Sequence, residues 1–362
     1  MPPDPFHETL ELLASGQTLS AAQAQEAFGL IMSGQAQASQ IGAMLGMLQV
    51  RGPTVAEITG AARAMRASAV PVHAPPGLTL LDTCGTGGDR AGTFNISTAA
   101  ALVAAGAARP LGVAVAKHGN RSVTSRSGSS QVLETLGVRL QVPPQTLGRC
   151  LQDAGLCFCF APAHHPAMKH AAPVRRDLGF RTLFNILGPL TNPAGVQRQV
   201  LGVFDPGLVP ILAEVLRDLG AQAAMVVNGA LGPDDPTRRL DELSTCGPTQ
   251  VCHLHDGTVE SFELDPEDLG LARVSPRSLE VDGPQASAKV IRLVLSGDPG
   301  PPRDVVCLNA AAALVVADVA EDLGAGLRIA AEAIDRGAAR MVLEALVRIT
   351  NEADASTPER SS

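Results

Sequence analysis

The sequence predicts an α/β fold in which a small N-terminal helical domain precedes a larger α/β domain with a mainly parallel central sheet. Three observations lead to this prediction. The first seventy residues carry helix-capping pairs and apolar residues at helical spacing, a proline-rich stretch follows them, and short β-like runs then alternate with alanine-rich helical runs. Strands that alternate with helices favour a parallel sheet with helices on both faces.

Capping signals mark the N-terminal helices. Ser20 precedes Gln23 by three residues and Thr54 precedes Glu57 by the same spacing, which is the pattern of a capping box. Between these two signals an apolar stripe recurs at helical spacing, and it indicates a face that packs against neighbouring helices. The stripe consists of Ile41, Met44, Leu45 and Leu48.

A linker and alternating elements follow. Residues 70–77 contain three prolines and cannot continue a helix, so they are predicted to connect the two domains. Strands are expected at 78–81, 113–116, 200–204 and 223–227, and helices at 98–106, 132–136, 208–219, 305–316 and 324–349. The polar tail 351–362 has little apolar surface to bury and is expected to be disordered.

Composition narrows the class of protein. The chain of 362 residues is 45% hydrophobic and 18% charged, so it can bury a large core. Its seven cysteines are scattered without a CxxC pair, which favours buried thiols over a disulfide framework or a zinc site. A net charge of −8 and the absence of Trp and Tyr argue against nucleic acid as a partner. No apolar run reaches the roughly 18–20 residues that span a bilayer, and the first sixteen residues include acidic ones, so we expect a cytoplasmic protein without a membrane partner.

A glycine-rich segment follows the first predicted strand. This first loop, Asp82–Thr98, contains Gly85-Thr-Gly-Gly-Asp89 and then Asn95-Ile-Ser-Thr98 at the start of a helix. Its glycines allow a tight turn with exposed amides, and a helix N-terminus favours anions. It lacks the third glycine of a dinucleotide fingerprint and the Gly-Lys-Ser/Thr of a nucleotide P-loop. We interpret it as a phosphate-binding loop; the alternative is an ordinary strand-to-helix turn with a capping hydroxyl.

The second loop, Lys117–Ser129, follows the next predicted strand. It holds three cations, five hydroxyls and two glycines within 13 residues. Only three of the 28 basic residues are lysines, so Lys117 in a glycine-rich loop favours a point charge directed at phosphate. A solvated surface loop is the alternative. Two such loops after neighbouring strands indicate a ligand with two separate phosphate groups.

These motifs resemble the anthranilate phosphoribosyltransferase family. The resemblance rests on Gly85–Asp89, Asn95–Thr98 and Lys117-His-Gly-Asn-Arg121, and it continues through 165–193 and the acidic pair Asp241-Glu242, so it covers nearly the whole chain. It implies transfer of the phosphoribosyl group of 5-phosphoribosyl 1-pyrophosphate to the amine of anthranilate. The expected products are N-(5-phosphoribosyl)anthranilate and pyrophosphate, in L-tryptophan biosynthesis.

The resemblance also implies the domain organisation. The fold would be of the nucleoside phosphorylase/phosphoribosyltransferase type. Residues 1–70, joined by roughly 165–195, would form the helical domain, and 71–164 with 196–350 would form the catalytic α/β domain. The resemblance further implies a homodimer that forms through the helical part. It also implies a cleft between the domains, with Arg175 opposite the first and second loops.

Site residues follow from the same resemblance. The cofactor is expected to be Mg²⁺, with Ser97, Asp241 and Glu242 as ligands, because Mg²⁺ takes oxygen ligands and is usually held by one or two carboxylates together with substrate phosphates. The expected catalytic residues are Lys117, Asn120 and Arg175, whose guanidinium can bind the anthranilate carboxylate through two parallel hydrogen bonds. His118, His165 and Pro189 are expected to line the acceptor pocket. The substrate-binding set is Gly85, Gly88, Asp89, Thr93, Asn95, Ser97, Thr98, Lys117, His118, Gly119, Asn120, Arg121, Ser122, Val123, Thr124, Ser125, Ser129 and Arg175.

Two rival functions share parts of this pattern. A pyrimidine-nucleoside phosphorylase-like transferase has a related lysine-bearing loop but lacks the acidic pair and the Arg175 segment. A catalytically silent relative that binds nucleic acid would have a basic face and degraded loops, whereas here the loops are intact. One departure from the family is the longer link Ala230–Leu240, which precedes the acidic pair and contains two further acidic residues.

Overall fold

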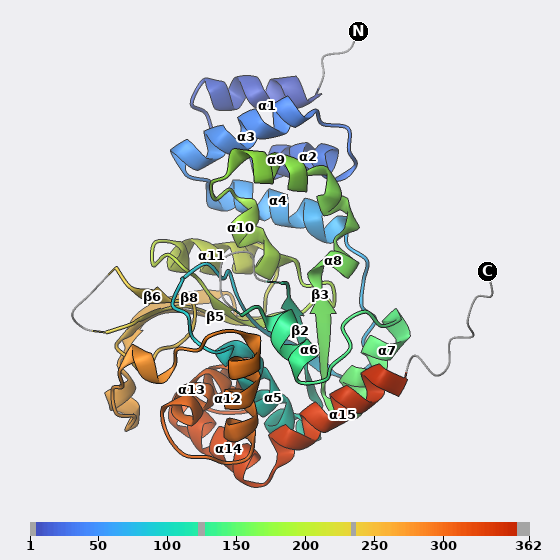
Figure 1. Cartoon of the computed structure of the whole chain (residues 1–362). Helices are drawn as coiled ribbons and strands as arrows, with labels where there is room; N and C mark the ends of the chain where they lie inside the picture. Colours follow the sequence, from blue (N-terminus) through green and yellow to red (C-terminus); the bar gives the residue numbers. More distant parts are fainter. Residues whose placement is uncertain (1–4, 122–126, 233–236, 353–362) are drawn as a thin grey trace, which may run out of the picture.

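The computed structural model describes residues 5–121, 127–232 and 237–352 and places a helical part beside an α/β part (Figure 1). The predicted fold class is confirmed, because helices form the N-terminal part and a mainly parallel sheet lies at the centre of the larger part. Asn351 and Glu352, expected in the disordered tail, instead end the last helix, and the rest of the tail lies outside the described residues. Among the described helices, none is long and apolar enough to cross a membrane.

The N-terminal helices begin where their capping boxes predict. Both boxes are formed, by Ser20 with Gln23 and by Thr54 with Glu57. All four residues of the predicted apolar stripe are buried. The helices of this part are α1 (Pro5–Ala14), α2 (Ala21–Met32), α3 (Ala38–Arg51) and α4 (Val55–Ala67).

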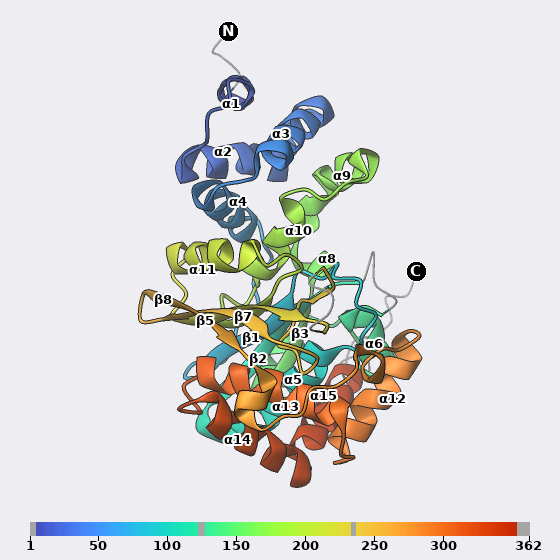
Figure 2. The ribbon, with the colours of Figure 1, turned by 90° about the vertical axis from the view of Figure 1, so that its left-hand side faces the viewer.

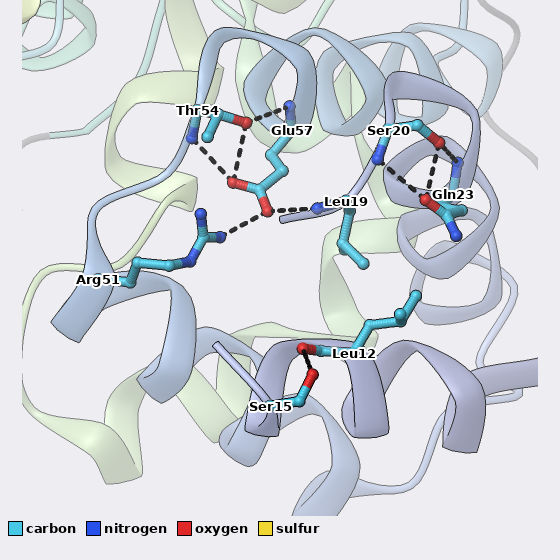
Figure 3. A network of polar contacts seen from close by, with 8 residues as sticks. All are labelled: Leu12, Ser15, Leu19, Ser20, Gln23, Arg51, Thr54 and Glu57. Carbon is cyan, nitrogen blue, oxygen red and sulfur yellow. Dashed lines mark hydrogen bonds and ion pairs between the residues drawn. The ribbon is translucent and has the colours of Figure 1, made fainter. Parts of the chain in front are cut away.

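Glu57 connects three of these helices (Figure 3). Its side chain is fully buried. One carboxylate oxygen accepts from the Leu19 N–H at 2.9 Å and pairs with the Arg51 guanidinium at 2.5 Å, while the other accepts from the Thr54 N–H at 2.8 Å. A buried carboxylate needs such a full set of partners, so this one residue fixes how α2, α3 and α4 meet.

The central sheet is parallel on one side and antiparallel on the other. Its strands are β1 (Thr79–Gly85), β2 (Val113–Gly119), β3 (Leu156–Phe160), β4 (Arg198–Gly202), β5 (Ala223–Ala230), β6 (Arg239–Leu240), β7 (Thr249–His255) and β8 (Thr258–Leu264). The order is β3-β2-β1-β4-β5-β7-β8, and β6 pairs with β5. Neighbours from β3 to β5 run parallel, whereas β6, β7 and β8 pair antiparallel. The predicted strands are present, but β3 and the antiparallel edge were not predicted.

Alternate residues of the strands point to opposite faces and build two cores. Val200 and Met225 belong to the core below the sheet, whereas Leu201 and Val226 belong to the core that continues into the helical part. Figure 2 shows the lower layer of helices and α11 on the other face. The lower layer comprises α5 (Ile96–Ala108), α12 (Pro284–Leu295), α13 (Pro301–Val316), α14 (Leu323–Asp335) and α15 (Ala338–Glu352), and α11 spans Leu208–Asp218.

The prediction of one long helix over 324–349 is wrong. α14 ends at Asp335 and α15 begins at Ala338. Gly337 lies between them with φ +72°, a left-handed conformation that ends a helix and that glycine adopts without a steric cost.

The segment that follows β3 returns to the helical part (Figure 1). It contains α8 (Ala161–His164), α9 (Ala172–Leu178) and α10 (Phe184–Leu187). α9 contacts α3 and α10 contacts α4. Before this segment come α6 (Ser129–Thr135) and α7 (Pro144–Arg149).

Candidate active site

The acidic pair lies at the carboxyl ends of β1, β4 and β5. The longer link before it returns as β6, whose Leu240 pairs with Gly229 of β5, so the extra length does not move the pair away from the sheet; residues 233–236 of the link lie outside the described residues. The backbone of the pair crosses the strand ends at very short range. A Cβ on Gly202 would lie 1.6 Å from the Asp241 carbonyl oxygen, and one on Gly85 would lie 2.3 Å from Asp241 Oδ2. Because the atom that Gly202 meets belongs to the backbone, only glycine fits there, whereas at Gly85 the Asp241 side chain would have to move.

Both acidic side chains accept hydrogen bonds from the first loop. Asp241 Oδ2 accepts from the Gly87 N–H at 2.7 Å, and Glu242 Oε1 accepts from the Ser97 N–H at 3.0 Å. The Asp89 carboxylate is a third acidic neighbour, 3.4 Å from the Asp241 backbone nitrogen. Ser97 and the acidic pair, expected to bind Mg²⁺, thus lie next to each other.

Burial and like charges change the titration of this pair. Burial raises the pKa of Asp241 well above its usual range, and the charges of Asp89 and Glu242 raise it further. Burial also raises the pKa of Glu242 to about 7, although the positive charge of Lys117 opposes this shift. Two buried carboxylates this close together can both be ionised only if a positive charge lies near them.

These residues fit Mg²⁺ that is shared with a substrate. Within the described part of the chain, no group of three or more His, Cys, Asp or Glu side chains is arranged to hold a metal ion by itself. Two adjacent buried carboxylates beside a serine agree with a hard cation that takes oxygen ligands and completes its shell with phosphates and water.

Lys117 was expected in a glycine-rich loop, but it lies in a strand. It belongs to β2, its exposed fraction is 2%, and its Nζ donates to the Thr83 carbonyl of β1. Neighbouring Asp82 is fully buried; burial raises its pKa and the Lys117 charge opposes that rise. Asp82 accepts from the His118 N–H at 3.1 Å and from Asn192 Nδ2 at 2.8 Å. A buried charge network thus lies within β1 and β2, where the two loops begin.

Asn95 connects the two loops to α12. Its Oδ1 accepts from the hydroxyls of Ser127 at 2.8 Å and Ser287 at 3.0 Å. Its backbone N–H donates to Ser287 Oγ at 3.0 Å. The Asn95 side chain, expected to bind substrate, is therefore engaged within the protein. No sequence motif pointed to Ser287.

The other residues of the two loops that were expected to bind substrate differ in their contacts. Thr93 pairs with Glu280 in an isolated β-bridge, and the buried Thr98 hydroxyl has no hydrogen-bond partner among the described residues. Asn120 is exposed and accepts from the Arg121 N–H, while Arg121 pairs with Glu134 at 3.2 Å. Gly119 and Ser129 lie against each other, since a Cβ on Gly119 would meet Ser129 Oγ at 2.5 Å. The predicted site residues Ser122, Val123, Thr124 and Ser125 lie outside the described residues.

Two neutral histidines pack together beside the 188–192 turn. The rings of His118 and His165 lie 5.1 Å apart, and His118 Nδ1 is 3.1 Å from the Gly188 carbonyl oxygen. Burial, helped by the neighbouring histidine, lowers the pKa of His118 to about 3, and burial lowers that of His165 to about 4. Both Nε2 atoms are buried without a hydrogen-bond partner in the described structure. Such atoms suit a polar group of a bound ligand.

Arg175 and Arg181 come from the segment that returns to the helical part. The Arg175 guanidinium lies 5.3 Å from the centre of the Phe184 ring, and burial lowers its pKa. Arg181, which the sequence analysis did not assign, donates through Nη2 to the Gly88 carbonyl. Arg181 is part of the 165–193 motif, but nothing in the motif distinguishes it from its neighbours.

Comparison with known proteins defines the class. Residues 7–69 match the helical bundle domain of a glycosyl transferase family, and residues 77–340 match its α/β domain. The two matches together cover most of the chain and identify it as a glycosyl transferase. Within this class it is a pentosyltransferase.

The relatives define the family more closely. The chain is 49% identical over 342 residues to the anthranilate phosphoribosyltransferase of Symbiobacterium thermophilum, covering 94% of this chain and 97% of the relative. The crystal structure of the Thermus thermophilus enzyme matches with a TM-score of 0.85 at 41% identity, covering 94% of this chain and 99% of the other. The Saccharomyces cerevisiae enzyme in complex with PRPP and Mg has a TM-score of 0.85 at 28% identity, with 96% and 98% covered. The chain belongs to the anthranilate phosphoribosyltransferase family.

Proposed function

We propose that the chain transfers the phosphoribosyl group of phosphoribosyl pyrophosphate to the amine of anthranilate, which forms N-(5-phosphoribosyl)anthranilate and pyrophosphate for tryptophan biosynthesis. The observation that supports this most is the pair of bonds from the first loop to the acidic residues, Gly87 N–H to Asp241 and Ser97 N–H to Glu242. They bring a phosphate-binding loop and a site for a hard cation together, as a pyrophosphate ester requires.

The first loop and Mg²⁺ would bind the pyrophosphate. We assign Ser97, Asp241 and Glu242 as the residues that hold Mg²⁺. When bound, the cation supplies positive charge at pyrophosphate oxygens, where negative charge develops as the bond to the ribose breaks. The amides of the first loop add hydrogen-bond donors at the start of α5. We assign Gly85, Gly88, Asp89, Thr93 and Thr98 to the walls of this pocket.

Lys117 would act from below the site. Because its ammonium is bonded to the Thr83 carbonyl, we infer that it does not contact the leaving group in this conformation. Its charge lowers the pKa of both Asp82 and Glu242 against the effect of burial. It would therefore favour the ionised form of Glu242, which is the form that binds a cation.

The acceptor would bind on the other side of the ribose. Arg175 is proposed to bind the anthranilate carboxylate, and its packing on Phe184 limits the directions in which the guanidinium can point. Asn120, His118 and His165 are proposed to line the ring pocket. Both histidines are neutral near pH 7, so they would act as hydrogen-bonding walls. Holding the amine beside the anomeric carbon can lower the barrier by about 7–11 kcal/mol.

The direct test is the loss of anthranilate fluorescence when the protein is mixed with anthranilate, phosphoribosyl pyrophosphate and Mg²⁺. We expect Mg²⁺-dependent loss in the wild type, near-complete loss of activity in Arg175→Ala, and wild-type activity in Arg176→Ala, the exposed neighbour on α9. Binding of phosphoribosyl pyrophosphate without any fluorescence change would point to a different acceptor. Fluorescence loss independent of Arg175 would contradict its assignment.

Two expectations from the resemblance stay predictions, namely a homodimer formed through the helical part and a cytoplasmic location. Sedimentation of the purified chain would test the first.

A further inference from the structure

Arg181 lies in the segment that returns to the helical part, and it contacts the glycine turn of the first loop. It follows α9, which contacts α3, and precedes α10, which contacts α4 (Figure 1). Its Nη2 donates to the Gly88 carbonyl. Gly88 has φ +83°, and a Cβ at this position would lie 3.1 Å from Arg181 Nη2, so glycine allows both the turn and the approach of the guanidinium.

The guanidinium of Arg181 is held from two sides. Its Cζ lies 3.9 Å from the centre of the Phe204 ring, at the distance of a close cation–π contact. Phe204 is itself connected to the first loop, because its N–H donates to Thr86 Oγ1 at 3.1 Å. Arg181, Phe204, Thr86 and Gly88 therefore form a closed ring of contacts around the turn.

The bond that holds the Gly88 carbonyl in one direction also sets the direction of the Asp89 N–H. The peptide group between Gly88 and Asp89 is planar and trans, so the carbonyl oxygen and the Asp89 N–H point in opposite directions. The carbonyl is directed at Arg181, and the Asp89 N–H has no hydrogen-bond partner in the described residues. An amide that has no internal partner and a defined direction at such a turn can donate to an anion.

The turn that Arg181 contacts lies beside acidic side chains. Three carboxylates lie together here, those of Asp89, Asp241 and Glu242. Lys117, whose charge acts on Glu242, is engaged with a backbone carbonyl. Arg181 forms no ion pair among the described residues; its contacts are the Gly88 carbonyl and the Phe204 ring.

We propose that Arg181 is a positioning residue for the pyrophosphate group: by binding the Gly88 carbonyl it orients the Asp89 N–H toward the anion and connects the first loop to the segment that carries Arg175. This inference rests on the proposed function. It predicts an effect on pyrophosphate that exceeds any effect on anthranilate, because Arg181 acts on the loop and not on the acceptor pocket.

The test compares Arg181→Met, Arg181→Lys and a matched control. Arg63→Met is suitable as the control because Arg63 also joins the helical part to the α/β part through one bond to a backbone carbonyl, that of Asp218 at 2.9 Å. The readouts are binding of Mg²⁺-pyrophosphate by calorimetry, the two KM values, and Tm. Phe204→Leu serves as a second variant, which keeps the backbone bond to Thr86.

We expect Arg181→Met to weaken Mg²⁺-pyrophosphate binding and raise KM for phosphoribosyl pyrophosphate by roughly 10- to 100-fold, with KM for anthranilate changed less than about twofold. Arg181→Lys should recover most of the loss, and Phe204→Leu should show a smaller loss of the same kind. Unchanged pyrophosphate binding in Arg181→Met, equal losses with lysine and methionine, or an equal loss in Arg63→Met would overturn the proposal. Because pyrophosphate binding needs no acceptor, failure of the wild type to consume anthranilate would contradict the proposed function and leave this test intact.

Discussion

The backbone of Asp241 passes so close to Gly202 that a Cβ on Gly202 would lie 1.6 Å from the Asp241 carbonyl oxygen. Gly202 ends β4, next to Gly85 at the end of β1. The carbonyl is backbone and cannot rotate away as a side chain could. The position of the acidic pair is therefore set by the absence of a side chain on the neighbouring strand.

Gly202→Ala should displace the acidic pair and lower activity. A shift of about 1 Å can cost roughly 100-fold in rate, so we expect a loss of this order in kcat/KM together with a higher Mg²⁺ requirement. The measurement is the fluorescence assay at a series of Mg²⁺ concentrations. Gly29→Ala is the control, because a Cβ there would meet nothing within 4 Å. Wild-type activity in Gly202→Ala would show that the pair can move without consequence.

Glu57→Gln should destabilise the protein without changing the chemistry. The change leaves Arg51 without its counter-charge and replaces one of the two acceptor oxygens by an NH2 group, so either the Leu19 N–H or the Thr54 N–H loses its acceptor; Arg51 is 24% exposed, and water can screen part of the loss. We expect the free energy of unfolding to fall by about 2–3 kcal/mol, as measured by denaturant unfolding. Gln23→Ala, in the exposed capping box, should cost no more than about 1 kcal/mol. An equal fall in the free energy of unfolding in the two variants would mean that the burial of Glu57 makes its contacts no more stabilising than those of an exposed capping box.

Local signals predicted more of this fold than long-range contacts could. The two capping boxes and the strands before the two loops depend on residues close in sequence, and they are present in the structure. The break at Gly337 was missed because alanine-rich helical spacing continues on both sides of it. The antiparallel edge was missed because the pairing of β7 with β5 depends on residues far apart in the chain.

The candidate site shows the same division. Ser97 and Glu242, expected as ligands of Mg²⁺ because their family pattern is specific, are neighbours in the structure, and their role as ligands stays a prediction. Lys117 was placed wrongly, because a lysine next to glycines gives no sign that it will be buried in a strand. Ser287 lies 192 positions from Asn95, and no local pattern could connect them.

His118→Asn should reduce the sensitivity of stability to acid. The pKa of His118 is lowered from 6.5 to about 3 in the folded state, so the fold favours the neutral ring. Its contribution is full above the unfolded pKa and is lost as the pH falls from 6.5 toward 3. Between about pH 7.5 and about pH 5 the wild type should therefore lose up to about 2 kcal/mol more than the variant. Denaturant unfolding at both pH values measures this difference, and identical losses would contradict it.

Ser287→Ala should weaken binding of phosphoribosyl pyrophosphate. The serine hydroxyl is fully buried, accepts from the Asn95 N–H and donates to Asn95 Oδ1, and Asn95 in turn accepts from Ser127 of the second loop. Removing it leaves a partly buried N–H without a partner, a loss of about 1–3 kcal/mol, or roughly 5- to 150-fold in an equilibrium constant. Because both loops are attached to Asn95, we expect this loss in KM for phosphoribosyl pyrophosphate, with KM for anthranilate little changed. Initial rates at varied substrate concentrations check this, and Ser278→Ala on the exposed 276–278 turn is the control. A rise in KM for anthranilate alone would show that Asn95 supports the acceptor side.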